Sequence, residues 1–242
     1  MRHVNVLGLI VATTLGLAAC DPGAQGSSDT AATTQNLLTQ TATTSLPGGL
    51  EQQGPSIDVS LLGFNRGPED ALVRVVELSD YGCGYCRQFH METFPTLLTD
   101  FMESGKVQWK FMPFITGMFE NSLSATEGAE CALEQSSDLF LVLNERLWTD
   151  QADWKKSDNP DAVVRTMATE AGVDMAAWDG CVAQDRRHDR IASATALAQQ
   201  LGVRGTPTFF VVGYPPLQGA LPTDAFQEIL NTVYAEATGG GN

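Results

Sequence analysis

The segment Asp-Tyr-Gly-Cys-Gly-Tyr-Cys, residues 80–86, decides the fold because of the two patterns that it separates. Residues 72–78 before it are mostly Val and Leu, a composition typical of a strand. Residues 83–104 place their apolar side chains at helical spacing. A C-x-x-C pair, Cys83 and Cys86, is therefore expected where a strand passes into the first turn of a helix.

This position gives the two cysteines different chemistry. Backbone N–H groups at a helix N-terminus have no partner within the helix, and the macrodipole is positive there. Both effects favour the thiolate of Cys83, which is the nucleophilic form of cysteine. Cys86 follows one turn later, so we expect it to be the buried sulfur and Cys83 the exposed one. A fall in the pKa of Cys83 from about 8.5 to about 5 would stabilise the reduced form by about 2.7 kcal/mol at pH 7, or about 60 mV.

The rest of the chain is expected to complete an α/β domain. A second strand at residues 107–114 makes a strand–helix–strand unit, which implies that the two strands are parallel. Residues 119–201 look mainly helical, with one helix starting at Pro160. The last part is expected to contain a strand at 208–212, a returning antiparallel strand at 217–221, and an amphipathic helix at 223–237 with Thr223 as its N-cap.

A second motif, Gly-Val-Arg-Gly-Thr-Pro-Thr at residues 202–208, follows the cysteines at a distance of more than 100 residues. It resembles the cis-proline loop of thioredoxin-fold oxidoreductases, which faces the C-x-x-C pair. The resemblance implies a cis peptide bond before Pro207 and pairing of the Thr206 backbone with an extended substrate peptide. A lone C-x-x-C is a weak signal, but the two motifs in this order are a strong one.

With both motifs, the chain resembles the DsbA-like thioredoxin-fold thiol:disulfide oxidoreductases. The resemblance implies a thioredoxin-like domain at residues 57–238 with an inserted helical domain at 119–201, and it requires no organic cofactor. It also bears on Glu77, six residues before Cys83. Glu77 is either a carboxylate at an edge that faces water or, as in DsbA-like proteins, a buried acid that shuttles the proton of the inner thiol, Cys86.

The direction of electron flow is open at this point. We expect a dithiol oxidase that acts on free thiols of exported proteins and is re-oxidised by a membrane or small-molecule partner. The Gly84-Tyr85 dipeptide and the Thr206-Pro207 pair are also similar to DsbC-type isomerases, so a reductase or isomerase is the alternative. Those isomerases carry a folded N-terminal dimerisation domain, however, and residues 21–55 are too polar to form one.

Two further alternatives give the C-x-x-C pair another role. A metal-binding or metal-delivery module would use Cys83, Cys86 and His90, which share one helical face, although structural zinc sites usually have four protein ligands. A purely structural disulfide between Cys83 and Cys86 is the other alternative. Outside a metal site, His90 is expected to be a solvated helix residue.

Two more cysteines, Cys131 and Cys181, lie in the helical part of the chain. An exported protein favours their pairing. A bridge across a loop of about 50 residues would contribute on the order of 4 kcal/mol by loop entropy. We expect a structural disulfide, with a second redox pair as the alternative.

Residues 1–20 resemble the signal peptide of a bacterial lipoprotein. A polar start precedes an apolar run that is too short for a transmembrane helix, and Leu-Ala-Ala-Cys at residues 17–20 is similar to a lipobox. The resemblance implies that Cys20 is lipidated, and Asp21 after it is associated with retention at the inner membrane. We therefore expect an extracytoplasmic, lipid-anchored protein on the periplasmic face.

Two segments are too poor in large apolar residues to form a core. We expect residues 21–56 to be a flexible tether and residues 239–242 to be a disordered tail. The formal net charge is −15, which argues against nucleic acid as a partner and against electrostatic binding to anionic lipid headgroups.

Overall fold

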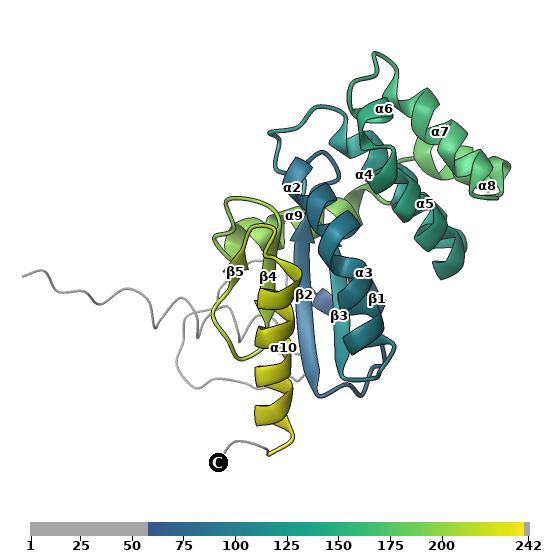
Figure 1. Ribbon diagram of the computed structural model, residues 1–242. Coiled ribbons are helices and arrows are strands. Elements are labelled where there is room, and N and C mark those ends of the chain that lie inside the picture. The colour runs from purple at the N-terminus through teal and green to yellow at the C-terminus, as the bar shows by residue number, and fades with distance from the viewer. Residues whose placement is uncertain (1–57, 240–242) are drawn as a thin grey trace, which may run out of the picture.

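The computed structural model describes residues 58–239. A five-stranded mixed sheet lies at its centre, and most of the helices of the inserted segment gather beyond the end of β2 (Figure 1). The strands follow the order β1-β3-β2-β4-β5. Their bounds are β1 (Phe64–Arg66), β2 (Val73–Ser79), β3 (Val107–Pro113), β4 (Thr208–Val211) and β5 (Leu217–Gln218).

The central strands β2 and β3 run parallel, with Val75 opposite Trp109, as the strand–helix–strand pattern predicted. The other three pairs of neighbouring strands are antiparallel. Helices cover both faces of the sheet, and β2 is accordingly buried at every position except Arg74. The last residue of this buried strand, Ser79, leads directly into the cysteine motif.

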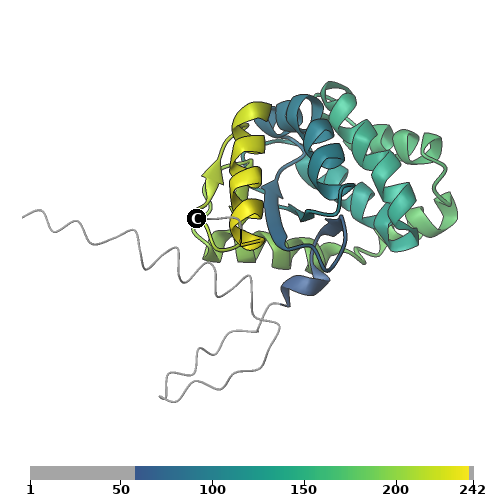
Figure 2. The ribbon, with the colours of Figure 1, turned by 60° about the horizontal axis from the view of Figure 1, so that its bottom comes forward.

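One face of the sheet packs against α10 (Thr223–Ala237) and a helical run that follows the cysteine motif, and the other face packs against α9 (His188–Gln200) (Figure 2). The helical run is continuous but not uniform, since two π turns widen it. It consists of α2 (Gly84–Gln88), η2 (Phe89–Thr93), α3 (Phe94–Leu97) and η3 (Leu98–Met102).

The helices between β3 and α9 form a block whose core includes Leu143, Leu147 and Trp148 and continues to both cysteines of the motif. The block consists of α4 (Ser122–Gln135), α5 (Ser137–Thr149), α6 (Gln151–Lys155), α7 (Pro160–Glu170) and α8 (Met175–Ala183). Pro160 occupies the first turn of α7, as predicted, and the side chain of Asn159 caps this helix. A disulfide between Cys131 and Cys181 joins α4 to α8, with 5.8 Å between the two Cα atoms.

Three local details differ from the sequence predictions. Thr223 is the first residue of α10 rather than its N-cap, because its hydroxyl bonds to the Glu92 carbonyl and the Thr93 hydroxyl instead. The returning strand β5 is shorter than predicted, since Gly219 leaves the extended conformation at φ +84°. Gly239, expected in the disordered tail, forms a turn just after α10, where its N–H donates to the Glu236 carbonyl.

The predicted signal peptide with Cys20, the tether at 21–56 and residues 240–242 of the predicted tail lie outside the described residues. A short η1 turn (Val59–Leu61) opens the described chain. Within residues 58–239, no helix combines the length and the hydropathy that a bilayer span requires.

Candidate active site

The two cysteine thiols meet at the N-terminus of α2, where Cys83 is the N-cap residue. The backbone N–H of Cys86 donates to Sγ of Cys83 at 3.4 Å. The Cys83 thiol donates in turn to the carbonyl oxygen of Thr206 at 3.3 Å, and the peptide bond between Thr206 and Pro207 is cis. The structure therefore brings together four predicted site residues that come from two distant parts of the sequence.

The environments of the two thiols move their pKa values in opposite directions. A hydrogen bond from Cys86 outweighs burial and, with hydrogen bonds from the backbone N–H groups of Tyr85 and Cys86, lowers the pKa of the Cys83 thiol to about 6. Burial raises the pKa of Cys86 well above its ordinary value, and the neighbouring Cys83 adds to this rise. The reduced pair is thus arranged to hold one thiolate at Cys83 and one neutral thiol at Cys86.

The prediction that Cys83 is the exposed sulfur is wrong in degree, although the order of the two cysteines is as expected. Cys83 is 3% exposed and Cys86 is 0% exposed. Cys83 is covered because the Thr206 carbonyl lies within hydrogen-bonding distance of its sulfur. Tyr85, between the two cysteines, is 68% exposed and marks the side of the motif that faces solvent.

Asp80 fixes the loop that leads into the cysteines. Its buried carboxylate accepts hydrogen bonds from the Gly82 N–H at 2.9 Å and from the Ser122 hydroxyl at 2.5 Å. It also accepts from the backbone N–H of Thr116 at 3.0 Å and from the Thr116 hydroxyl at 2.9 Å. One side chain thereby ties the cysteine loop to the start of α4 and to the segment before it.

Two side chains of helix α6 bind the backbone carbonyl oxygens of the same loop. The side-chain amide of Gln151 donates to the carbonyls of Tyr81 at 2.6 Å and Cys83 at 3.0 Å, and Lys155 donates to the carbonyl of Gly82. A Cβ atom at Gly82 would lie 2.3 Å from the Ser122 hydroxyl, so the close approach of the loop to α4 requires glycine. The inserted helices thus contribute directly to the position of Cys83.

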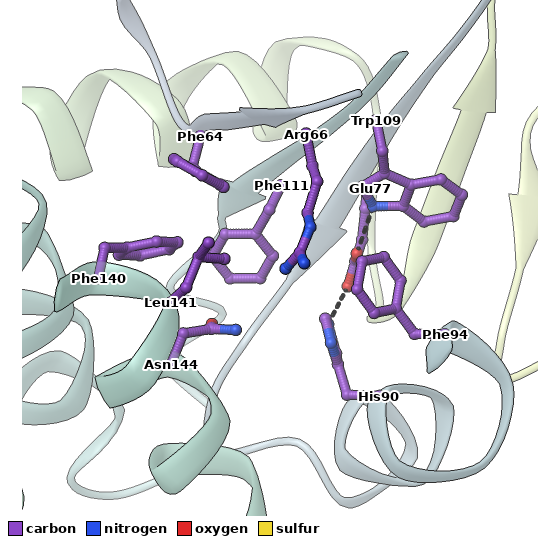
Figure 3. Close-up of a pocket in the computed structure, with 10 residues that line it drawn as sticks. All are labelled: Phe64, Arg66, Glu77, His90, Phe94, Trp109, Phe111, Phe140, Leu141 and Asn144. Atoms are coloured by element: carbon purple, nitrogen blue, oxygen red, sulfur yellow. Dashed lines mark hydrogen bonds and ion pairs between the residues drawn. The ribbon is translucent and has the colours of Figure 1, made fainter. Parts of the chain in front are cut away.

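Glu77 lies on β2 behind the cysteines and is fully buried, so the interpretation as an edge carboxylate that faces water is wrong. Its Oε1 accepts from the Ser79 hydroxyl. The same atom lies 2.7 Å from Nε2 of His90, and Oε2 accepts from the Trp109 indole at 2.8 Å (Figure 3). The prediction that His90 is solvated is also wrong. His90 is buried against Trp148, with ring centroids 4.4 Å apart and planes inclined by 9°.

The metal-binding alternative finds no support in this geometry. Among residues 58–239, no group of three or more His, Cys, Asp or Glu side chains is placed to hold a metal ion. His90 engages Glu77 through its Nε2 atom, while the two cysteines engage each other and Thr206.

Comparison with known proteins agrees with the motifs. A family model described as Thioredoxin matches residues 63–232, which is more than half of the chain. The chain belongs to the thioredoxin family. The DsbA-like resemblance and the thioredoxin fold with a helical insertion, both indicated by the sequence, are thereby confirmed.

Individual relatives and solved structures extend the comparison. "Probable disulfide bond formation protein D" of Bacillus cereus is 27% identical over 151 residues, which cover 61% of this chain and 68% of that protein. The structure of oxidised BdbD from Bacillus subtilis superposes with a TM-score of 0.65 at 22% identity, covering 73% of this chain and 95% of that chain. The Na(+)/H(+) antiporter NhaA 3 of Salinispora tropica is 32% identical over 61% of this chain, but the match spans only 21% of the antiporter.

Sequence reasoning on this thioredoxin-family chain missed several residues of the site. His90 stands four residues after the buried Cys86, and side chains at this spacing share a helix face, which is a signal for burial. Asp80 lies within the cysteine motif itself, but no pattern in the sequence indicates its partners. Gln151 and Lys155 belong to the helical insertion, and nothing in the sequence places them beside the cysteines.

In the reduced form of this thioredoxin-family protein, the lowered pKa of Cys83 should make stability depend on pH. An unfolded cysteine titrates at about pH 8.5, whereas Cys83 in the folded protein titrates at about 6. Between these values the folded state binds fewer protons than the unfolded state, so the free energy of unfolding rises with pH. This contribution is fully present near the unfolded pKa and is lost as the pH falls through the folded pKa.

Denaturant unfolding of the reduced and the oxidised protein between about pH 5 and about pH 8 tests this prediction. The oxidised protein lacks both thiols, so the difference between the two forms isolates them. The reduced form should gain stability relative to the oxidised form as the pH rises above about 6, and reduced Cys83→Ser should show no such gain. If the thiolate absorbance of Cys83 rose with a midpoint at about pH 8.5, the lowered pKa would be contradicted.

Proposed function

We propose that this protein is an extracytoplasmic thiol–disulfide oxidoreductase that exchanges its Cys83–Cys86 disulfide with cysteines of exported proteins and works as a dithiol oxidase. The observation that carries the proposal is the asymmetry of the pair at the start of α2. One sulfur is stabilised as a thiolate and the other as a thiol. This asymmetry supports a reduced form that is stable at neutral pH, and a stable reduced form makes the disulfide a good oxidant.

The proposed reaction begins with the oxidised pair. A substrate thiolate attacks Sγ of Cys83, a new disulfide forms, and the electron pair of the broken bond goes to Sγ of Cys86. A second thiolate of the substrate then attacks its own sulfur in the mixed disulfide. The substrate leaves with its disulfide formed, and Cys83 leaves as the stabilised thiolate.

The other site residues support these steps. The Thr206 carbonyl, 3.3 Å from Sγ of Cys83, lies where the backbone of an extended substrate would pass, and Pro207 after it can donate no hydrogen bond. Cys86 must gain a proton when it leaves, because its burial disfavours the thiolate. Glu77 is the buried acid that we assign to this proton; it accepts a hydrogen bond from Ser79, which also lowers the raised pKa of Cys86.

The thiolate at Cys83 accounts for only part of the direction of electron flow. A pKa of about 6 is a smaller fall than the fall to about 5 considered from the sequence. It therefore supplies less than about 60 mV of the roughly 150 mV that separates thioredoxin-like reductants from DsbA-like oxidants. The sequence relatives named for disulfide bond formation support the oxidising direction, and a reductase or isomerase is the outcome that would replace it.

A redox titration with glutathione tests the proposal. Mixtures of reduced and oxidised glutathione should set the Cys83–Cys86 pair to a potential near about −120 mV, as in strong oxidants. The fraction of oxidised protein is measured by mass after the free thiols are alkylated. A potential near about −270 mV would make the protein a reductant instead.

We also propose that the protein is attached to the periplasmic face of the inner membrane through lipid on Cys20, with residues 21–56 as a tether. The lipobox-like Leu-Ala-Ala-Cys at residues 17–20 supports this proposal. Labelling of cells with a radioactive fatty acid should mark the wild-type protein but not Cys20→Ser. If the wild-type protein carried no label and appeared in the soluble periplasmic fraction, the lipid anchor would be contradicted.

A further inference from the structure

The sulfur of Cys86 has no contact with solvent, yet the proposed reaction requires a proton to reach it and leave it in each cycle. The first two groups on the way lie on β2. The Ser79 hydroxyl donates to Oε1 of Glu77, and Ser79 is also close enough to Cys86 to lower the otherwise raised pKa of that thiol. Both residues are fully buried, so neither can exchange a proton with water directly.

A third group continues the path on the far side of Glu77. Nε2 of His90 lies 2.7 Å from the same carboxylate oxygen that accepts from Ser79. The ring of His90 is held in place by its stacking on Trp148. The indole of Trp109 donates to the other carboxylate oxygen, so Glu77 itself is fixed.

We propose that Glu77 and His90 share one proton and that His90 is the positioning and relay residue through which this proton is exchanged between Cys86 and water. The inference rests on the proposed oxidoreductase function and adds a residue that this function does not assign. A lone carboxylate would be costly at full burial, but Glu77 and His90 with one shared proton carry no net charge.

The proton balance of one cycle follows from this arrangement. When the substrate thiolate breaks the Cys83–Cys86 bond, the Ser79 hydroxyl turns from Glu77 to Cys86 and gives its proton to that sulfur. Ser79 then receives the proton that Glu77 and His90 share, through Oε1 of Glu77. The pair of Glu77 and His90 is then left as carboxylate and neutral imidazole, and His90 takes one proton from water. When an oxidising disulfide re-forms the Cys83–Cys86 bond, the proton of Cys86 returns along the same groups and His90 releases one to water.

The proposed relay would reach water through a small cavity beside His90. Its volume is about 30 Å³, enough for a water molecule, and Glu77 and His90 both line it. Asn144 from α5 and Arg66 from β1 point toward the same space (Figure 3). The two polar side chains offer hydrogen bonds to such a water, whereas the rest of the lining is aromatic or aliphatic.

The other groups near His90 bear on any pH dependence. Arg66 is the cation of the cavity wall, and burial raises the pKa of Tyr81, whose hydroxyl donates to Asn144 at 2.6 Å. Helix α5 presents Asn144 and Trp148, and β3 presents Trp109 and Phe111, none of which titrates as an acid or base near neutral pH. On the helical run of His90 itself, Arg87 is bonded to the Trp148 carbonyl and Glu92 to Gln88.

The variant His90→Gln tests the relay. Glutamine can still donate a hydrogen bond to Glu77, but it cannot take up a proton. His188→Gln is the matched control, because it makes the same change at an exposed position at the start of α9. The readout is the rate at which a peptide with two cysteines reduces the Cys83–Cys86 disulfide, corrected for the ionised fraction of the peptide thiol.

We expect the corrected rate of His90→Gln at pH 7 to be about ten to a hundred times lower than that of the wild type. This loss is smaller than the rate gain of about 10²–10⁴ that a direct general acid or base supplies. The corrected rate of His90→Gln should fall as the pH rises, because the proton must then come from solution, whereas the wild type and His188→Gln should show a flat profile. A His90→Gln rate that is reduced without this slope, or that equals the wild-type rate, would overturn the relay. A wild type that does not oxidise the peptide at all would instead overturn the proposed function.

A second measurement uses only the wild-type protein and holds even if His90→Gln does not fold. The same rate is measured in mixtures of H₂O and D₂O, with the peptide thiol kept fully ionised. A relay in which several protons move together should give a rate that curves downward with deuterium content. A rate that does not change with deuterium content would overturn the proposal.

Discussion

Cys83→Ser should bring the oxidation of a two-cysteine peptide down to the uncatalysed rate. A serine hydroxyl forms no disulfide, and it is not ionised at neutral pH. In the wild type, a pKa of about 6 leaves Cys83 mostly as thiolate at pH 7, so the variant loses both the nucleophile and the electron acceptor. The measurement is peptide oxidation by a catalytic amount of protein with oxidised glutathione in excess.

Cys86→Ser is the matched control, since it removes the partner sulfur but keeps the thiolate of Cys83. This variant should still react with oxidised glutathione and then accumulate a mixed disulfide at Cys83, because no second sulfur is present to resolve it. Mass spectrometry should find one added glutathione on Cys86→Ser and none on Cys83→Ser in the folded protein. Unchanged peptide oxidation by Cys83→Ser would end the catalytic assignment and leave the pair a structural disulfide.

The fold could be predicted from the sequence because its decisive features are local patterns in a fixed order. The strand before the motif at residues 80–86 and the helical spacing after it were enough to place Cys83 at a helix N-terminus, where the structure has it as the N-cap. The loop at Thr206 and Pro207 was placed opposite by resemblance, and the Thr206 carbonyl lies 3.3 Å from the Cys83 sulfur.

Groups behind the cysteines were harder to predict, because their roles come from contacts between segments. A period of 3.6 residues describes an ideal helix, but the π turn η2 widens the helix at Phe89–Thr93 and buries Phe89, His90 and Thr93 together. The prediction that His90 lies at the surface rested on its polar side chain, although its spacing from the buried Cys86 is a signal for burial. Its burial also depends on Trp148 of α5, a helix of the insertion whose packing no local pattern describes.

The inserted helices help to position the cysteine loop. Helix α4 supplies Ser122 to the Asp80 carboxylate, and α6 supplies Gln151 and Lys155 to the carbonyls of the cysteine loop. Cys83 is therefore positioned from two sides, by the sheet that carries its strand and by the inserted helices. Loss of order in the insertion should accordingly reach the active site as well as the stability.

Replacing both Cys131 and Cys181 with Ala should lower the free energy of unfolding by about 4 kcal/mol. The bridge spans 50 residues and joins α4 to α8, so without it the unfolded chain regains the entropy of a long open loop. Both cysteines are buried, and alanine introduces no polar group at either position. Urea unfolding of the double variant and of the wild type, each with the Cys83–Cys86 pair reduced, measures the difference.

The single variant Cys131→Ala separates loss of the bridge from loss of packing. If the bridge accounts for the effect, the single and double variants should lose nearly the same stability, because either change breaks it and their effects do not add. Peptide oxidation by the folded double variant well below its unfolding midpoint should stay close to the wild-type rate, since Ser122 and Gln151 still reach the cysteine loop. A double variant that keeps wild-type stability but loses peptide oxidation would make Cys131 and Cys181 a second redox pair.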